Sequence, residues 1–139
     1  DGGMAGMPAE EFAQMVEEAP RGARLAEWRD RDGLLVAGCI VDDDGDALSA
    51  VYSYFEPTAP GRSLGVQVVL SLLTWGLGAG RRHLYLGYLI GETHKMAYKQ
   101  SFRPLERLVR GRWTDAADED GRFESPAAGS IVRASDEEA

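Results

Sequence analysis

The chain has 139 residues, of which 44% are hydrophobic and 27% charged, enough apolar content for one domain with a buried core. No basic signal peptide is present at the N-terminus, so nothing indicates secretion and we expect a cytoplasmic location. The single cysteine, Cys39, excludes an internal disulfide and a cysteine-based zinc site, and its apolar surroundings predict a buried small side chain.

The charges are distributed unevenly along the chain. The formal net charge of −8 argues against an anionic partner for the chain taken as a whole. Residues 62–112, however, carry 9 Lys/Arg against 2 Asp/Glu, whereas residues 1–61 carry 4 against 13 and residues 113–139 carry 2 against 8. Such a basic block indicates a face that binds an anionic ligand. The alternative is that two acidic ends solubilise a neutral core.

The first part of the chain predicts a helix and then three strands. A helix over residues 7–20 is indicated by acidic residues after Pro8, and Pro20 ends it. The strands are expected at residues 24–28, 34–41 and 47–56. The acidic stretch at residues 42–46 lacks the glutamate that an EF-hand calcium loop requires, so we interpret it as a hairpin turn.

Residues 63–80 contain no charged side chain, which raises the question of a membrane span. Glycines, a glutamine and a threonine within the stretch make a span unfavourable. A buried helix over residues 64–78, packed against a sheet, is the better interpretation. Ser63 is predicted to be its N-cap, and glycines after the last turn end it.

The second part of the chain predicts a strand, a short helix and a last strand, at residues 83–90, 92–101 and 108–114. Residues 115–139 are rich in Asp, Glu, Ala, Gly and Ser, so we expect an acidic, flexible tail. Antiparallel strands followed by a strand–helix–strand crossover give a mixed α/β sheet flanked by helices. His83 and His94 have no metal-ligand companions in the sequence, so no metal site is expected.

The start of the predicted long helix is a candidate anion site. The preceding loop delivers Arg62, Ser63 and Gly65 to the first helical turn. A helix N-terminus offers free backbone N–H groups and a positive dipole, and a glycine lets a phosphate approach the backbone. The stretch from Arg62 to Gly65 is therefore interpreted as an anion cradle.

Six short motifs occur between Leu48 and Trp113, in the order LSAVYSYFEP, RSLG, YLGY, KMAYK, FRPLERL and GRW. In this order and at this spacing they resemble the C-terminal domain of the arginyl/leucyl-tRNA-protein transferases, enzymes of the N-end rule pathway. The family's N-terminal, cysteine-bearing domain has no counterpart in this sequence. We therefore expect one domain over residues 1–114, followed by the tail.

The resemblance implies a fold similar to the GNAT acyltransferases, in which a splayed pair of strands admits the acyl donor. Members of the family use aminoacyl-tRNA as the donor in place of acyl-CoA. They transfer leucine or arginine to the α-amine of a protein that begins with Asp or Glu. No cofactor and no membrane partner is implied, and the sequence does not decide between leucine and arginine.

The resemblance also implies roles for residues around the donor. Arg62, Ser63 and Gly65 would hold the phosphates and the 3′ end of the donor. Lys95 and Lys99 would supply positive potential for the tRNA backbone.

Three further residues complete the candidate site. Arg103 would bind the acidic side chain of the acceptor, because its guanidinium suits a carboxylate. Tyr88 would line the reaction cleft, and Glu56 would accept the proton of the amine. An aminoacyl ester is already activated, so positioning, an oxyanion donor and a proton for the ribose oxygen suffice.

Two other functions stay open at this point. The same fold would support a CoA-dependent N-acetyltransferase, for which a fuller R-x-x-G-x-G/A loop would be expected; Val66 and Gln67 stand in place of its last residues. A non-catalytic module that binds tRNA or acidic N-termini is the second alternative.

Overall fold

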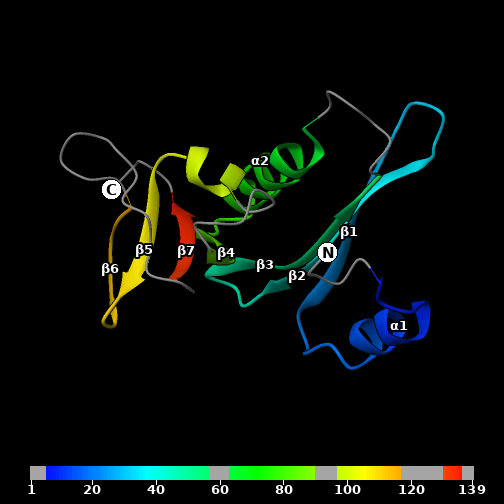
Figure 1. The fold of residues 1–139 in the computed structure, drawn as a ribbon, viewed down its shortest axis with the longest axis horizontal. Helices are drawn as coiled ribbons and strands as arrows, with labels where there is room; N and C mark the ends of the chain where they lie inside the picture. The colour runs from blue at the N-terminus through cyan, green and yellow to red at the C-terminus, as the bar shows by residue number, and fades with distance from the viewer. Residues whose placement is uncertain (1–5, 57–62, 90–96, 117–129, 136–139) are drawn as a thin grey trace.

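The computed structural model describes residues 6–56, 63–89, 97–116 and 130–135. The elements in chain order are α1 (Ala9–Glu17), β1 (Ala23–Arg29), β2 (Leu35–Asp43), β3 (Ala47–Phe55), α2 (Leu64–Gly78), β4 (His83–Leu89), the 3-10 helix η2 (Ala97–Ser101), β5 (Leu105–Val109), β6 (Arg112–Asp115) and β7 (Ser130–Ser135). Helix α2 and η2 lie on one side of the sheet and α1 lies on the other (Figure 1).

The seven strands form one sheet in the order β1-β2-β3-β4-β7-β5-β6. Strands β1, β2 and β3 form the predicted antiparallel meander, and β3 and β4 pair in parallel through the α2 crossover. The mixed α/β sheet predicted from the sequence is therefore confirmed.

The core lies between the sheet and α2. Leu48, Leu72, Leu84 and Leu105 are among the fully buried side chains, and they come from β3, α2, β4 and β5. The outer side of α2 is not covered by the described residues, since Leu70 and Leu77 are about half exposed. The prediction of a buried helix is thus right for one side of α2 and wrong for the other. Burial of its inner side against three strands is sufficient to hold a largely apolar helix.

Two parts of the C-terminal half differ from the prediction. The single strand expected at residues 108–114 is a hairpin of β5 and β6, because Arg110 and Gly111 have φ angles of 48° and 78° and reverse the chain. The segment predicted to be a flexible tail contains β7, which pairs with β4 on one side and β5 on the other. The tail prediction is therefore wrong for these six residues of β7, which two neighbouring strands hold in the sheet.

The acidic stretch after β2 is the predicted hairpin turn between β2 and β3. The Asp44 carboxylate accepts hydrogen bonds from the N–H groups of Asp46 (2.9 Å) and Ala47 (2.7 Å). The Asp43 carboxylate instead binds Arg81 in the α2–β4 loop, with Nε at 2.7 Å and Nη2 at 3.0 Å. This bidentate ion pair joins the β2–β3 hairpin to the start of β4. It neutralises one negative charge of the acidic turn and one positive charge of the basic block.

The Asp43–Arg81 ion pair predicts a pH dependence of stability. The hydrogen bond from Arg81 is the main reason that the pKa of Asp43 lies below its ordinary value. A carboxyl with a lowered folded-state pKa stabilises the fold above about pH 3.9, the unfolded-state pKa, and loses this contribution as the pH falls through the folded-state pKa. Urea unfolding of the wild type and Asp43→Asn should therefore differ most at pH 7 and converge in acid. A difference that is the same at pH 7 and pH 3 would contradict this.

The Cys39 thiol is fully buried, as predicted, and burial raises its pKa to about 11. At pH 8 the reactive thiolate is therefore only on the order of one part in a thousand of the thiol. We expect iodoacetamide at pH 8 to leave the folded chain unmodified and to alkylate Cys39 once urea unfolds it, as measured by mass spectrometry. Alkylation of the folded chain at the rate of free cysteine would show that the thiol is accessible.

Candidate active site

Strands β3 and β4 begin side by side and then separate. Their parallel pairing covers Ala47 with His83, Leu48 with Leu84, and Ser49 with Tyr85. Within the described chain no further pair joins them, although β3 continues to Phe55 and β4 to Leu89. The sheet is therefore open between the C-terminal halves of β3 and β4, as the resemblance implied.

Both strands carry an irregularity where they separate. In β3, Ala50 and Tyr52 pair with two consecutive residues of β2, so Val51 between them is an extra, unpaired residue. In β4, Leu86 is inserted in the same way against β7, and the following Gly87 has a φ of 71°. Such bulges bend a strand and increase its twist, which accounts for the opening.

Large aromatic side chains stand at both open strand ends. Phe55 at the end of β3 is 49% exposed and Tyr88 near the end of β4 is 60% exposed. Exposed aromatic rings are available to contact a ligand. Tyr88 lies on β4, the strand on which it was predicted, and its role in lining a reaction cleft stays a prediction.

The first turn of α2 lies against the β3 side of the opening. A Cβ atom built on Gly65 would lie 3.6 Å from Cζ of Tyr98 and 3.7 Å from Cε1 of Phe55. Among the described residues none accepts a hydrogen bond from the N–H groups of Leu64 and Gly65. Two backbone donors and the positive end of the helix dipole are therefore available for an anion.

The predicted role of Ser63 as a side-chain N-cap is wrong. Ser63 has φ 44° and ψ 47°, in the left-handed region, and its side chain makes no capping hydrogen bond. Its carbonyl oxygen instead accepts hydrogen bonds from the N–H groups of Val66 and Gln67. The capping hydroxyl requires an extended backbone at this position, which Ser63 does not adopt.

The 3-10 helix η2 contacts both α2 and β4. Tyr98 packs on Phe102 with ring centroids 6.3 Å apart, and burial raises the pKa of its phenol. The next residue, Lys99, donates hydrogen bonds from Nζ to the carbonyl oxygens of Leu86 (2.6 Å) and Tyr88 (3.0 Å). Sequence reasoning selected the lysines of KMAYK and missed Tyr98, although its aromatic ring between them was a signal of packing.

The other predicted site residues are only partly described. Arg62 and Lys95 lie outside the described residues. Glu56 is exposed at the end of β3, and its N–H donates to the carbonyl of Val36. Arg103 is exposed, and its Nη1 donates to the carbonyl oxygens of Gln100 and Phe102, both at 2.7 Å.

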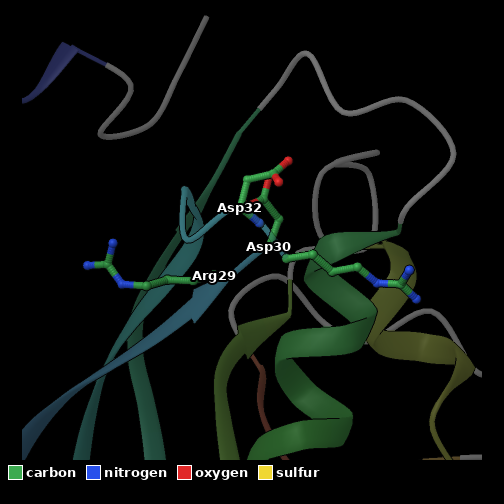
Figure 2. A pocket seen from close by; sticks show the side chains of 4 residues that line it. Arg29, Asp30 and Asp32 are labelled. Carbon is green, nitrogen blue, oxygen red and sulfur yellow. Dashed lines mark hydrogen bonds between the residues drawn. The ribbon is translucent and has the colours of Figure 1, made fainter.

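Two hollows lie beside the β1–β2 hairpin rather than between β3 and β4. One of about 450 Å³ is lined by Arg29, Asp30, Arg31 and Asp32. Figure 2 shows Arg29 pointing away from α2, while Asp30 and Asp32 lie close together. Arg29 is paired with Glu27 at 2.8 Å, and one Asp30 oxygen accepts the N–H groups of Asp32 and Leu34. The side chains of this hollow therefore mainly stabilise the hairpin itself.

The second hollow, of about 200 Å³, extends from the hairpin to the first half of α2. Its lining comprises Trp28, Arg29, Asp30, Val36, Ala37, Leu64, Gln67 and Val68. It adjoins the helix end described above but does not enter the opening between β3 and β4.

Neither a metal centre nor a membrane helix is found in the described part of the chain. No group of three His, Cys, Asp or Glu side chains there is placed to bind a metal ion. No helix in these segments is both long enough and apolar enough to cross a bilayer.

Solved structures share this fold. Tetrahymena GCN5 superposes with a TM-score of 0.62 at 10% identity, covering 94% of this chain and 77% of that one. A GNAT family acetyltransferase from Elizabethkingia anophelis with acetyl-CoA bound gives 0.56 at 10% identity, covering 92% and 83%. The Escherichia coli ribosomal-protein-S18-alanine N-acetyltransferase gives 0.55 at 14% identity, covering 94% and 80%. The chain therefore has the GNAT fold, as predicted.

Curated relatives of the chain carry the name aspartate/glutamate leucyltransferase. The protein from Granulibacter bethesdensis is 42% identical over 81% of this chain, and the one from Jannaschia is 47% identical over 85%. The chain spans 42% of the length of each of these two relatives. Residues 1–109 also match the family described as arginine-tRNA-protein transferase, C terminus. The chain therefore belongs to the arginine-tRNA-protein transferase family and contains its C-terminal region.

Proposed function

We propose that the protein containing this chain transfers leucine from leucyl-tRNA to the N-terminal α-amine of proteins that begin with Asp or Glu. The names of the curated relatives favour leucine over arginine as the transferred residue. Arginine is the second candidate, because the matched family is described as an arginine-tRNA-protein transferase. Both donors place the reaction in the cytoplasm, where aminoacyl-tRNA is found.

The observation that carries the proposal is the opening between β3 and β4, which has the N-terminus of α2 on its β3 side. Gly65 and the available N–H groups of Leu64 and Gly65 suit a phosphate of the donor. An acyl group attached to that donor can reach the opening, where the backbone groups of two separated strand ends are close by.

The reaction needs few groups from the protein. The neutral amine attacks the ester carbonyl of the aminoacyl-tRNA, a C–N bond forms and the C–O bond to the ribose breaks. The amine loses one proton and the ribose oxygen gains one, so no redox partner is needed. Holding the amine and the ester carbonyl in the geometry of attack can supply a large part of the acceleration in a reaction of this type.

Roles for individual residues follow from their positions. Glu56 directly follows the exposed Phe55 at the end of β3, which supports its predicted role as acceptor of the amine proton. The exposure of Tyr88 supports contact with a substrate. Arg103 is exposed beside η2, where it can meet an acidic acceptor side chain, and Arg62 and Lys95 keep their proposed roles toward the tRNA.

A transfer assay tests the proposal. Labelled leucyl-tRNA or arginyl-tRNA is incubated with the protein that contains this chain and with peptides that begin with Asp, Glu or Ala, and label in the peptide is measured. The Granulibacter bethesdensis relative is assayed in parallel as a reference. We expect label from leucyl-tRNA on the Asp and Glu peptides, and none on the Ala peptide or on an N-acetylated Asp peptide.

The two alternative functions give different outcomes. Turnover of acetyl-CoA without transfer from either tRNA would contradict the proposal and identify an N-acetyltransferase. Binding of tRNA without transfer by the protein that contains this chain would identify a non-catalytic module.

A methyl group added to Gly65 of α2 should weaken donor binding without disturbing the fold. The nearest atom to a Cβ on Gly65 is 3.6 Å away, an ordinary contact, so Gly65→Ala fits the fold. Alanine in a helix should raise the free energy of unfolding by roughly 0.5–1 kcal/mol. It should also raise KM for aminoacyl-tRNA by about tenfold or more, because the methyl group keeps a phosphate from the backbone.

Gly78→Ala is the matched control for that variant. Gly78 is the last residue of the same helix, and nothing lies within 4 Å of a Cβ built there. It should leave KM for aminoacyl-tRNA unchanged. Equal KM values for the wild type and Gly65→Ala would show that the first turn of α2 is not part of the donor site.

A further inference from the structure

The opening between β3 and β4 leaves part of β4 without its neighbour. In a continuous parallel ladder β3 would donate hydrogen bonds to carbonyl oxygens of β4. After Tyr85, β3 no longer pairs with β4 and no longer supplies these N–H donors, while β4 still pairs with β7 up to Leu89. Leu86 is only 3% exposed, so water has little access to this residue, whereas Tyr88 is 60% exposed. A backbone carbonyl left without a donor in such a place is costly.

Lys99 supplies the missing donors. Its Nζ lies 2.6 Å from the carbonyl oxygen of Leu86 and 3.0 Å from that of Tyr88, one on each side of Gly87. A single ammonium thus spans the bulge of β4. Hydrogen bonds from a charged donor are stronger than those between neutral groups.

The position of this ammonium is set by the residue before it. The Tyr98 ring lies near Gly65 of α2 and packs on Phe102, so η2 is anchored on the α2 side of the opening. Lys99 reaches from η2 to β4 on the other side. The short segment Tyr98–Lys99 therefore connects the two walls of the opening.

Lys99 carries its charge on a half-buried side chain. Burial lowers the pKa of the ammonium below its ordinary value. Among the described residues no carboxylate forms a salt bridge with it, and the groups recorded at its Nζ are the two carbonyl oxygens. Such burial is consistent with fixed contacts to the protein rather than with a freely exposed charge for tRNA.

We propose that Lys99 is a positioning residue, which holds the bulge of β4 in place and so keeps the opening between β3 and β4 ready for the acyl donor. This refines the role expected from the sequence, in which Lys99 contacts the tRNA backbone. Only the catalytic consequence of this inference rests on the proposed function. The structural part applies to the chain whatever its substrate is.

Amide hydrogen exchange tests the structural part without any substrate. Lys99→Met keeps the length of the side chain and removes its donors. Exchange of the β4 amides from Leu86 to Leu89 should rise roughly tenfold or more, whereas β1 and β2 amides should keep their rates. Lys99→Arg retains a cation with several N–H donors and should restore most of the protection. Arg82→Gln, which removes an exposed charge from the α2–β4 loop, is the charge-matched control and should leave the exchange rates of the β4 amides unchanged.

Steady-state kinetics test the catalytic part. For a positioning residue, Lys99→Met should lower kcat by roughly tenfold or more, with little change in KM or in the affinity for uncharged tRNA. The salt dependence of tRNA binding should also stay the same. Lys99→Arg should recover part of kcat.

Three results would overturn the inference. Unchanged β4 exchange in Lys99→Met would show that the two hydrogen bonds do not hold the strand. A uniform rise in exchange over all strands would reduce the role to general stability. Weaker tRNA binding with a shallower salt dependence and a normal kcat would identify Lys99 as a phosphate contact. Should the wild type transfer no amino acid, the proposed function fails, and the exchange result still decides the role of Lys99 in the fold.

Discussion

The separation of β3 and β4 after Ser49 and Tyr85 is the constraint on which the rest of the structure depends. A sheet that divides in its middle must satisfy the exposed backbone on both sides and must still bury a core. Here the two strands stay paired where they enclose Leu48 and Leu84 and separate where the bulges begin. The closed half gives stability, and the open half is the place where we propose that the acyl donor binds.

The basic block of the sequence has more than one use in the folded chain. Arg81 is bound to Asp43, Lys99 to two carbonyl oxygens of β4, and Arg133, outside the block, to Glu106 at 2.9 Å. Arg103 makes contacts with nearby backbone as well. The net charge of the block therefore overstates the charge that a polyanion would meet, because Asp43 neutralises Arg81. Lys99 and Arg103 keep their charge, but hydrogen bonds to the backbone hold their N–H groups. The potential that remains is carried by exposed side chains such as Arg82, Arg110 and Arg112.

The parts of the fold that were predictable have strong local patterns. The limits of α2 matched the prediction because an uncharged apolar run ends in glycines, and the meander matched because acidic turns separate β-rich runs. Strand β7 had no such pattern. Its six residues, SIVRAS, lie in a segment of disorder-like composition and become a strand only because β4 and β5 both pair with them.

The candidate site could likewise be predicted only in part. The position of Gly65 at a helix start and of Tyr88 on a strand beside the opening followed from sequence order. The contacts of Lys99 with β4 and of Tyr98 with Gly65 join separate elements, so composition and spacing could not supply them. No sequence pattern indicated the left-handed backbone of Ser63. Contacts between a side chain and the backbone of another element are the hardest to predict from a single sequence.

Strand β7 also has a consequence for the order in which the chain can fold. It is the last strand that the structure describes, yet it lies between β4 and the β5–β6 hairpin. During synthesis the N-terminal strands and α2 can pack early, because their contacts are between neighbours in the chain. The β5–β6 hairpin has no partner in the sheet until residues 130–135 have left the ribosome, so the sheet is completed from its interior by β7.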